Sequence, residues 1–171
     1  MSIRVWASAF ILTAGVLGLS ACGTQSGGEV VDESLTLQEA KTTAMNMETE
    51  LAAMVPGDVV ASIDQRQTGV LMSCEGARAY QWTGQTQIAY RTPEAIDPNA
   101  LVNESVAASP DRPGFTAKSA PFPDGQPGAH VIGEHGAGYL VNENVDRTGI
   151  EILSFSPCFV LPDGMSPSKQ Y

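Results

Sequence analysis

Apolar positions between residues 36 and 57 repeat with the period of an α-helix. Thr36-Leu37-Gln38-Glu39 matches a capping box, in which two side chains bond the first free backbone N–H groups of a helix. Residues spaced by three and four share one helical face, and here they are Leu37, Ala40, Ala44, Met47, Leu51 and Met54. The other face carries Glu39, Lys41, Thr43, Glu48 and Glu50. The pattern predicts a surface helix that ends at Pro56-Gly57.

After Gly57 the apolar residues form short runs between turn residues, which is typical of antiparallel strands. In the third run Gly84 suggests a bulge or bend. A second helix is predicted from Pro93 to Ala108. We therefore expect an α+β fold with two helices packed on an antiparallel sheet of about five to six strands. The runs span residues 59–63, 69–74, 77–91, 115–120, 129–133, 138–142 and 149–155.

The N-terminal segment has the pattern of an export signal. Arg4 is followed by a mostly apolar stretch, 5–19, that is short and rich in small residues for a membrane span. Leu19-Ser20-Ala21-Cys22 resembles a bacterial lipobox, which implies cleavage after Ala21 and acylation of the Cys22 sulfur. Two or more acyl chains hold a protein stably on a bilayer. The alternative is an ordinary secretory signal with a chance cysteine.

Composition divides the rest of the chain into a tether, one domain and a tail. Residues 22–33 are polar and contain glycine, as in a flexible tether, and residues 34–161 are enough for a single α+β domain. Residues 162–171 are expected to be loose. The net charge is −10, which argues against binding to nucleic acid or to anionic headgroups.

With Cys22 assigned to lipid, Cys74 and Cys158 remain. Outside the cytoplasm such a pair is expected to form one disulfide. A metal site or a redox dithiol is the alternative, but the chain has no Cys-x-x-Cys motif and no histidine at ligand spacing from either cysteine.

Two further groups of residues have side chains suited to binding or catalysis. Tyr80 and Trp82 share a strand face and could stack on sugar rings, although packing under a helix is the commoner use of such a pair. His130, Glu134 and His135 come near a zinc-protease pattern, but the glycines around them disfavour the helix that this motif requires. We therefore expect no metal site and no cofactor.

Several short motifs together resemble small actinobacterial envelope lipoproteins, including the mycobacterial LppA-like group. Besides the capped helix and the lipobox, they are Ser73-Cys74, Tyr80-Gln81-Trp82, Asp97-Pro98, Pro113-Gly114-Phe115 and Ser156-Pro157-Cys158-Phe159. The resemblance covers most of the chain after the signal. It implies an envelope location, a disulfide and helices on a sheet, and it implies no catalytic residue.

These observations predict a noncatalytic binding or accessory module of the cell envelope. It would sit on the extracytoplasmic face of the membrane through lipid on Cys22, and its partner would be an envelope protein or a lipid. One alternative is a carrier of an apolar ligand in a cavity between helix and sheet. The other is an enzyme centred on His130, Glu134 and Asp146.

Overall fold

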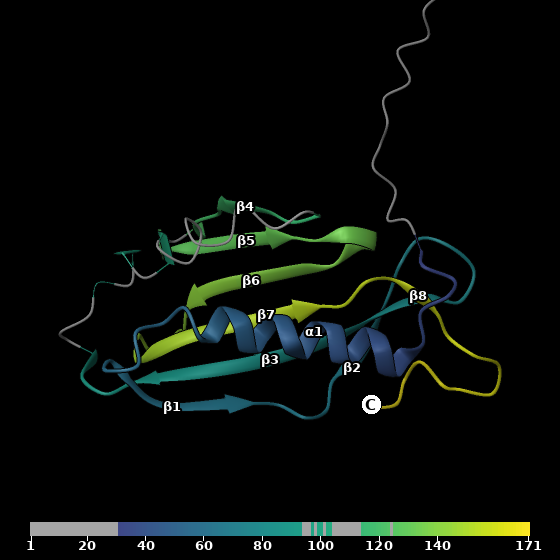
Figure 1. The fold of residues 1–171 in the computed structure, drawn as a ribbon, viewed down its shortest axis with the longest axis horizontal. Coiled ribbons are helices and arrows are strands. Elements are labelled where there is room, and N and C mark those ends of the chain that lie inside the picture. Colours follow the sequence, from purple (N-terminus) through teal and green to yellow (C-terminus); the bar gives the residue numbers. More distant parts are fainter. Residues whose placement is uncertain (1–30, 94–96, 98, 101, 104–113, 124) are drawn as a thin grey trace, which may run out of the picture.

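In the described part of the chain, a long α-helix packs on one face of an eight-stranded antiparallel sheet (Figure 1). The computed structural model describes residues 31–93, 97, 99–100, 102–103, 114–123 and 125–171. In chain order its elements are α1 (Leu37–Ala52), β1 (Val60–Gln65), β2 (Val70–Ser73), β3 (Ala79–Tyr90), β4 (Thr116–Ser119), β5 (Gly128–Ile132), the short 3-10 helix η2 (Glu134–Gly136), β6 (Gly138–Glu143), β7 (Gly149–Phe155) and β8 (Phe159–Val160).

The predicted fold class was wrong in its balance of helix and sheet. Among the described residues α1 is the one long α-helix, where two helices were expected, and there are eight strands, where five to six were expected. Most of the second predicted helix, Pro93 to Ala108, lies outside the described residues, but within that range the described residues Asn99, Ala100, Val102 and Asn103 are helical. The strand count was low partly because β8 is only two residues long and is defined by its pairing with distant Ala79 and Tyr80.

The long strand β3 organises the sheet, whose main order is β1-β3-β7-β6-β5-β4. On one edge it pairs with β1 and β2, and on the other edge with β7 and β8. Thr83 shows the arrangement, because it lies opposite Val70 of β2 and opposite Phe155 of β7. Strands β7, β6, β5 and β4 then follow as antiparallel neighbours.

Local sequence explains where α1 begins. Thr36 caps the helix by accepting the N–H of Glu39 on its hydroxyl, and the Glu39 carboxylate accepts the N–H of Thr36 in return at 2.9 Å. This confirms the predicted capping box. The hydrogen bonds to Thr36 also hold the pKa of Glu39 below its usual value.

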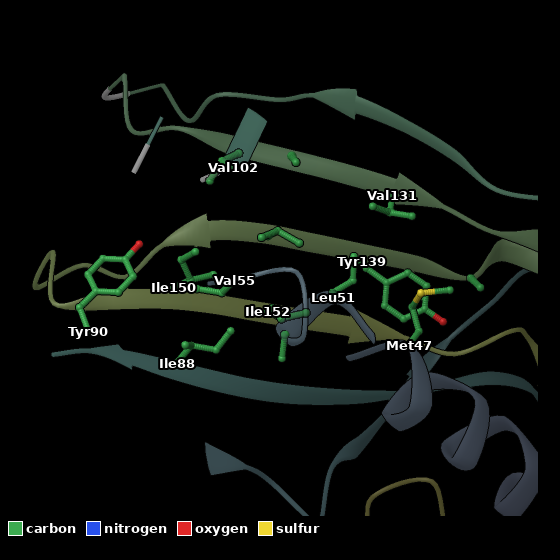
Figure 2. Packing of buried hydrophobic residues seen from close by; sticks show 14 residues of the cluster. Met47, Leu51, Val55, Ile88, Tyr90, Val102, Val131, Tyr139, Ile150 and Ile152 are labelled. Atoms are coloured by element: carbon green, nitrogen blue, oxygen red, sulfur yellow. The ribbon is translucent and has the colours of Figure 1, made fainter. Parts of the chain in front are cut away.

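Side chains of α1 and the sheet form two hydrophobic clusters. The larger one joins Met47 and Leu51 of α1 to Ile88, Ile150 and Ile152 of the sheet, all of them buried (Figure 2). The smaller cluster holds Ala40, Ala44, Trp82, Phe159 and Leu161. Burial of these side chains supplies the main favourable term in the stability of the domain.

Both ends of the described fold are joined to it. Asp32 forms a parallel bridge with Phe159, within the range 22–33 that was expected to be a tether. Tyr171 and Gly69 exchange two backbone hydrogen bonds of 2.8 and 3.0 Å, and the Trp82 indole N–H donates to the Tyr171 carbonyl at 3.0 Å. The segment 162–171, expected to be loose, is thus tied to the sheet edge through Tyr171.

Candidate functional site

The sheet has one face against α1 and one face directed away from it. Side chains of a strand alternate between the two faces, and paired residues of neighbouring strands share a face. Trp82, Thr86 and Ile88 of β3 lie on the α1 face, so Thr83, Gln85 and Gln87 lie on the other. We call this second surface the open face; from the strand register it includes Ser62, Asp64, Val70, Met72, Gln81, Thr83, Gln85, Gln87, Thr116, Lys118, His130, Ile132, Leu140, Asn142, Glu151, Leu153, Phe155 and Val160.

The open face carries several apolar side chains that are exposed or half-buried. Val70, Met72 and Ile132 are 48%, 46% and 36% exposed, and Leu153 and Phe155 are half-buried. Among the described residues α1 packs only on the opposite face. Contiguous exposed apolar surface in a folded protein is characteristic of binding sites.

A pocket of ≈340 Å³ lies on the open face where the loop between β1 and β2 meets β3 and β7. Its apolar lining comes from Val70, Met72, Leu153 and Phe155. Its polar lining comes from Arg66, Thr68, Thr83, Gln85 and Gln170, with backbone at Gly69, Gly84 and Ser154. The volume lies within the usual range of ligand pockets, at its small end.

The polar groups of this pocket fall into two sets. Thr83 donates its hydroxyl to the Val70 carbonyl at 3.1 Å, and Gln85 donates its amide to Glu151, so these two side chains are already bonded. The side chains of Arg66, Thr68 and Gln170 form no hydrogen bond or ion pair with the described residues. One cation and two neutral groups therefore remain available to a ligand.

A buried carboxylate lies beneath the other face of the same strands. Glu48 of α1 is fully buried, and its oxygens accept hydrogen bonds from Gln65 at 2.9 Å, from Thr86 at 2.7 Å and from Ser154. No cation among the described residues forms an ion pair with it. Three neutral donors from β1, β3 and β7 thus compensate the buried charge.

Glu48 was expected on the exposed face of the helix, and the structure corrects this. It follows Ala40 and Ala44 at intervals of four, so helical spacing alone places it beside them. Its polarity was the reason for the wrong placement. Its burial gives no access to a ligand, so we assign it a structural role.

The stacking pair predicted at Tyr80 and Trp82 is largely enclosed. Trp82 is fully buried between α1 and the sheet, with Lys41 Nζ 5.5 Å from its ring centroid, and Tyr80 is half-buried beside the same cluster. The Trp82 ring therefore presents no free face to a sugar. The two residues do share one strand face, as their spacing predicts.

The histidine region does not assemble a metal centre in the part of the chain that the structure describes. No group of three or more His, Cys, Asp or Glu side chains there is arranged to hold an ion. His130 lies in β5, and Glu134 and His135 lie in η2. Burial, and then the nearby Lys118, lower the pKa of His130 below its usual value.

Asp146 is far from Glu134, with which it was grouped, together with His130, as the possible centre of an enzyme. Glu134 lies before β6 and Asp146 lies after it, at opposite ends of a six-residue strand. Such a strand spans on the order of 20 Å. The two carboxylates therefore belong to different sites.

The cysteine pairing is confirmed. Cys74 and Cys158 form a disulfide with 6.3 Å between their Cα atoms, and it joins the residue after β2 to the residue before β8. Cys22 lies outside the described residues. Within the described residues no helix has the length and apolar character needed to cross a bilayer.

Comparisons with other proteins add one structural likeness. No protein-family model and no curated protein matches this chain. Among solved structures, it is similar to the crystal structure of a DUF4853 family protein from Actinomyces odontolyticus, with a TM-score of 0.43 and 16% sequence identity over 82% of this chain and 78% of that chain. No conclusion about this chain follows from a likeness of this size.

Proposed function

We propose that this protein is a noncatalytic binding module of the cell envelope, anchored by lipid on Cys22 to the extracytoplasmic face of the membrane, and that the open face is its binding surface. The observation that carries the binding role is the exposed apolar surface of that face with its pocket. The proposed address rests on the lipobox-like sequence around Cys22 and on the resemblance to envelope lipoproteins.

The disulfide supports an extracytoplasmic location. Disulfides form and persist in oxidising compartments and are rare where cellular thiols stay reduced. The bond between Cys74 and Cys158 links two segments 84 residues apart in the sequence. A lipid-anchored domain on the outer side of the membrane meets the conditions that this bond needs.

The packing supports an external binding surface more than an internal carrier cavity. Between α1 and the sheet, the two clusters bring Leu51 against Ile152 and place the small side chains of Ala40 and Ala44 beside Trp82. Protein interiors filled in this way leave little room for a ligand. The pocket lies on the open face instead.

Labelling with palmitate tests the anchor. Cells that express the full chain or its Cys22→Ser variant are grown with labelled palmitate and then fractionated. We expect label and membrane association for the full chain, and loss of both for the variant. Label that persists without Cys22 contradicts the proposed anchor.

Site-specific photo-crosslinking in intact cells tests the binding surface. A photoreactive residue is placed at Gln87 or Ile132 on the open face, or at Thr43 or Asn46 on the solvent side of α1 as matched controls. All four side chains are exposed. We expect a discrete crosslinked envelope component from the open face only. Crosslinks from α1 alone contradict the assignment of the open face.

A further inference from the structure

We infer that the pocket beside the β1–β2 loop binds a small amphiphile that carries one anionic group, such as a carboxylate, on an apolar body. The inference rests on the proposed binding function and specifies one ligand class for the same face. Four apolar side chains line the pocket: Val70, Met72, Leu153 and Phe155. They offer a surface for one short chain or ring, because the volume is ≈340 Å³.

Charge selects an anion over a neutral or cationic ligand. Arg66 is the one charged residue of the pocket lining, and no carboxylate of the lining opposes it. The whole chain has 19 acidic and 9 basic residues, so a positively charged pocket is not expected from composition. A guanidinium group binds carboxylates through two parallel N–H donors, which a neutral head group cannot match.

Neighbouring groups complete the head-group site. Thr68 and Gln170 line the pocket with Arg66, and their side chains make no hydrogen bond with the described residues. Thr83 and Gln85, by contrast, are already bonded. A ligand carboxylate beside Arg66 can therefore receive further hydrogen bonds from Thr68 and Gln170 while its apolar part covers Val70 and Phe155.

The backbone holds the Arg66 end of the site in place. Arg66 donates its backbone N–H to the Gln85 carbonyl at 2.9 Å, and Gly69 is bonded in both directions to Tyr171. Gly69 also has no room for a side chain, because a Cβ there would lie 1.8 Å from the Thr83 carbonyl oxygen. The loop is thus fixed at both ends before any ligand binds, which lowers the entropic cost of binding.

Photolabelling of the full-length protein in lipid nanodiscs tests the inference. The probes are a diazirine analogue of decanoate and the matching diazirine decanol, which differ only in the head group. After irradiation, labelled residues are mapped by mass spectrometry. We expect the decanoate probe to label peptides that contain Val70, Met72, Leu153 or Phe155.

Two charge variants separate this pocket from general attraction to the open face. Arg66→Gln should lower labelling by the decanoate probe roughly tenfold, the loss expected for one charge-assisted contact, and should leave decanol labelling unchanged. Lys118→Gln removes a cation from the same face outside the pocket and should change neither probe. A thermal melt equal to that of the wild type shows that each variant is folded.

Other results overturn the inference. Equal labelling by both probes, insensitivity to Arg66→Gln, or labels outside the pocket would each exclude an anion-selective site. None of these results decides the proposed function, because in-cell crosslinking tests it from Gln87 and Ile132, which do not line the pocket. Conversely, absence of crosslinks together with Arg66-dependent labelling would keep the ligand site and remove the protein-binding role.

Discussion

Glu48 shows how one buried charge can specify the position of a helix on a sheet. Its three donors come from three different strands, so the carboxylate is satisfied only when α1 sits in one register. Glu48→Ala leaves Gln65, Thr86 and Ser154 without this acceptor and creates a small cavity. We expect a loss of about 3 to 5 kcal/mol in the free energy of unfolding, measured by urea denaturation.

The exposed neighbour Thr43 provides the matched control for Glu48. Thr43→Ala changes a side chain of α1 that faces solvent, and its effect should stay within about 0.5 kcal/mol. A similar, small loss for both variants would show that the carboxylate network contributes little to stability.

Tyr90 links burial of a single hydroxyl to alkaline stability. Burial, reinforced by Glu143, raises the pKa of Tyr90 to about 12, and its hydroxyl makes no hydrogen bond with the described residues. Because the folded state holds this proton more tightly than the unfolded state, the stabilisation is complete below about pH 10 and is lost as the pH rises through 12. The loss should be on the order of 2 kcal/mol.

Tyr90→Phe should abolish this alkaline loss. The variant removes an unbonded buried hydroxyl, so its stability at pH 7 should equal or slightly exceed that of the wild type. Urea denaturation between pH 8 and pH 12 measures the difference. Tyr80→Phe is the control and should retain the wild-type alkaline profile; a wild-type profile in Tyr90→Phe would refute the prediction.

At the scale of elements, local signals were predictable and distant pairings were not. The capping box predicts where α1 begins because that signal lies in adjacent residues, but the helix ends at Ala52, four residues before the predicted stop at Pro56-Gly57. Strand β8 was missed because two residues are too few to show an alternation of apolar and polar positions. Only their pairing with Ala79 and Tyr80 makes them a strand. The pocket on the open face was missed for a similar reason, since Arg66 and Gln170 line it together only in the folded chain.

Gly84 corrects another expectation at this scale. Of the predicted bulge or bend, a bulge in the pairing with β7 is excluded, because β3 continues through Gly84, which pairs with Ser154 without a register shift. A Cβ at this position would press against the Trp82 ring and lie 2.5 Å from Glu48 Oε1. Glycine is therefore required here by close packing under α1.

Gly84→Ala should be strongly destabilising because neither neighbour can move. Trp82 and Glu48 are both fully buried. We expect a loss of about 3 kcal/mol or more in the free energy of unfolding, as in overpacked cores. Gly57→Ala is the matched control, since a Cβ there has no neighbour within 4 Å and its effect should be below about 1 kcal/mol. Equal stability of the two variants would contradict the packing argument.

At the scale of the whole molecule, the disulfide joins parts of the fold that other contacts also bring together. Near Cys158, Asp32 donates its N–H to the Cys158 carbonyl at 2.9 Å, and Cys158 donates its own N–H to the His135 carbonyl at 2.8 Å. The chemistry of this pairing was predictable from cysteine count and export signal. Its surroundings were not, because they depend on residues more than 20 positions away in the sequence.

Removing the disulfide tests how far the domain depends on an oxidising compartment. The bond closes a loop between residues 84 positions apart, which stabilises the folded state by about 4 to 5 kcal/mol in the chain-entropy model. The double variant Cys74→Ala/Cys158→Ala should lose most of this amount, and its melting temperature should not respond to reductant. The wild type should melt lower with reductant than without it. If the oxidised wild type and the double variant have the same melting temperature, the disulfide is not needed for stability. It then no longer supports an extracytoplasmic location.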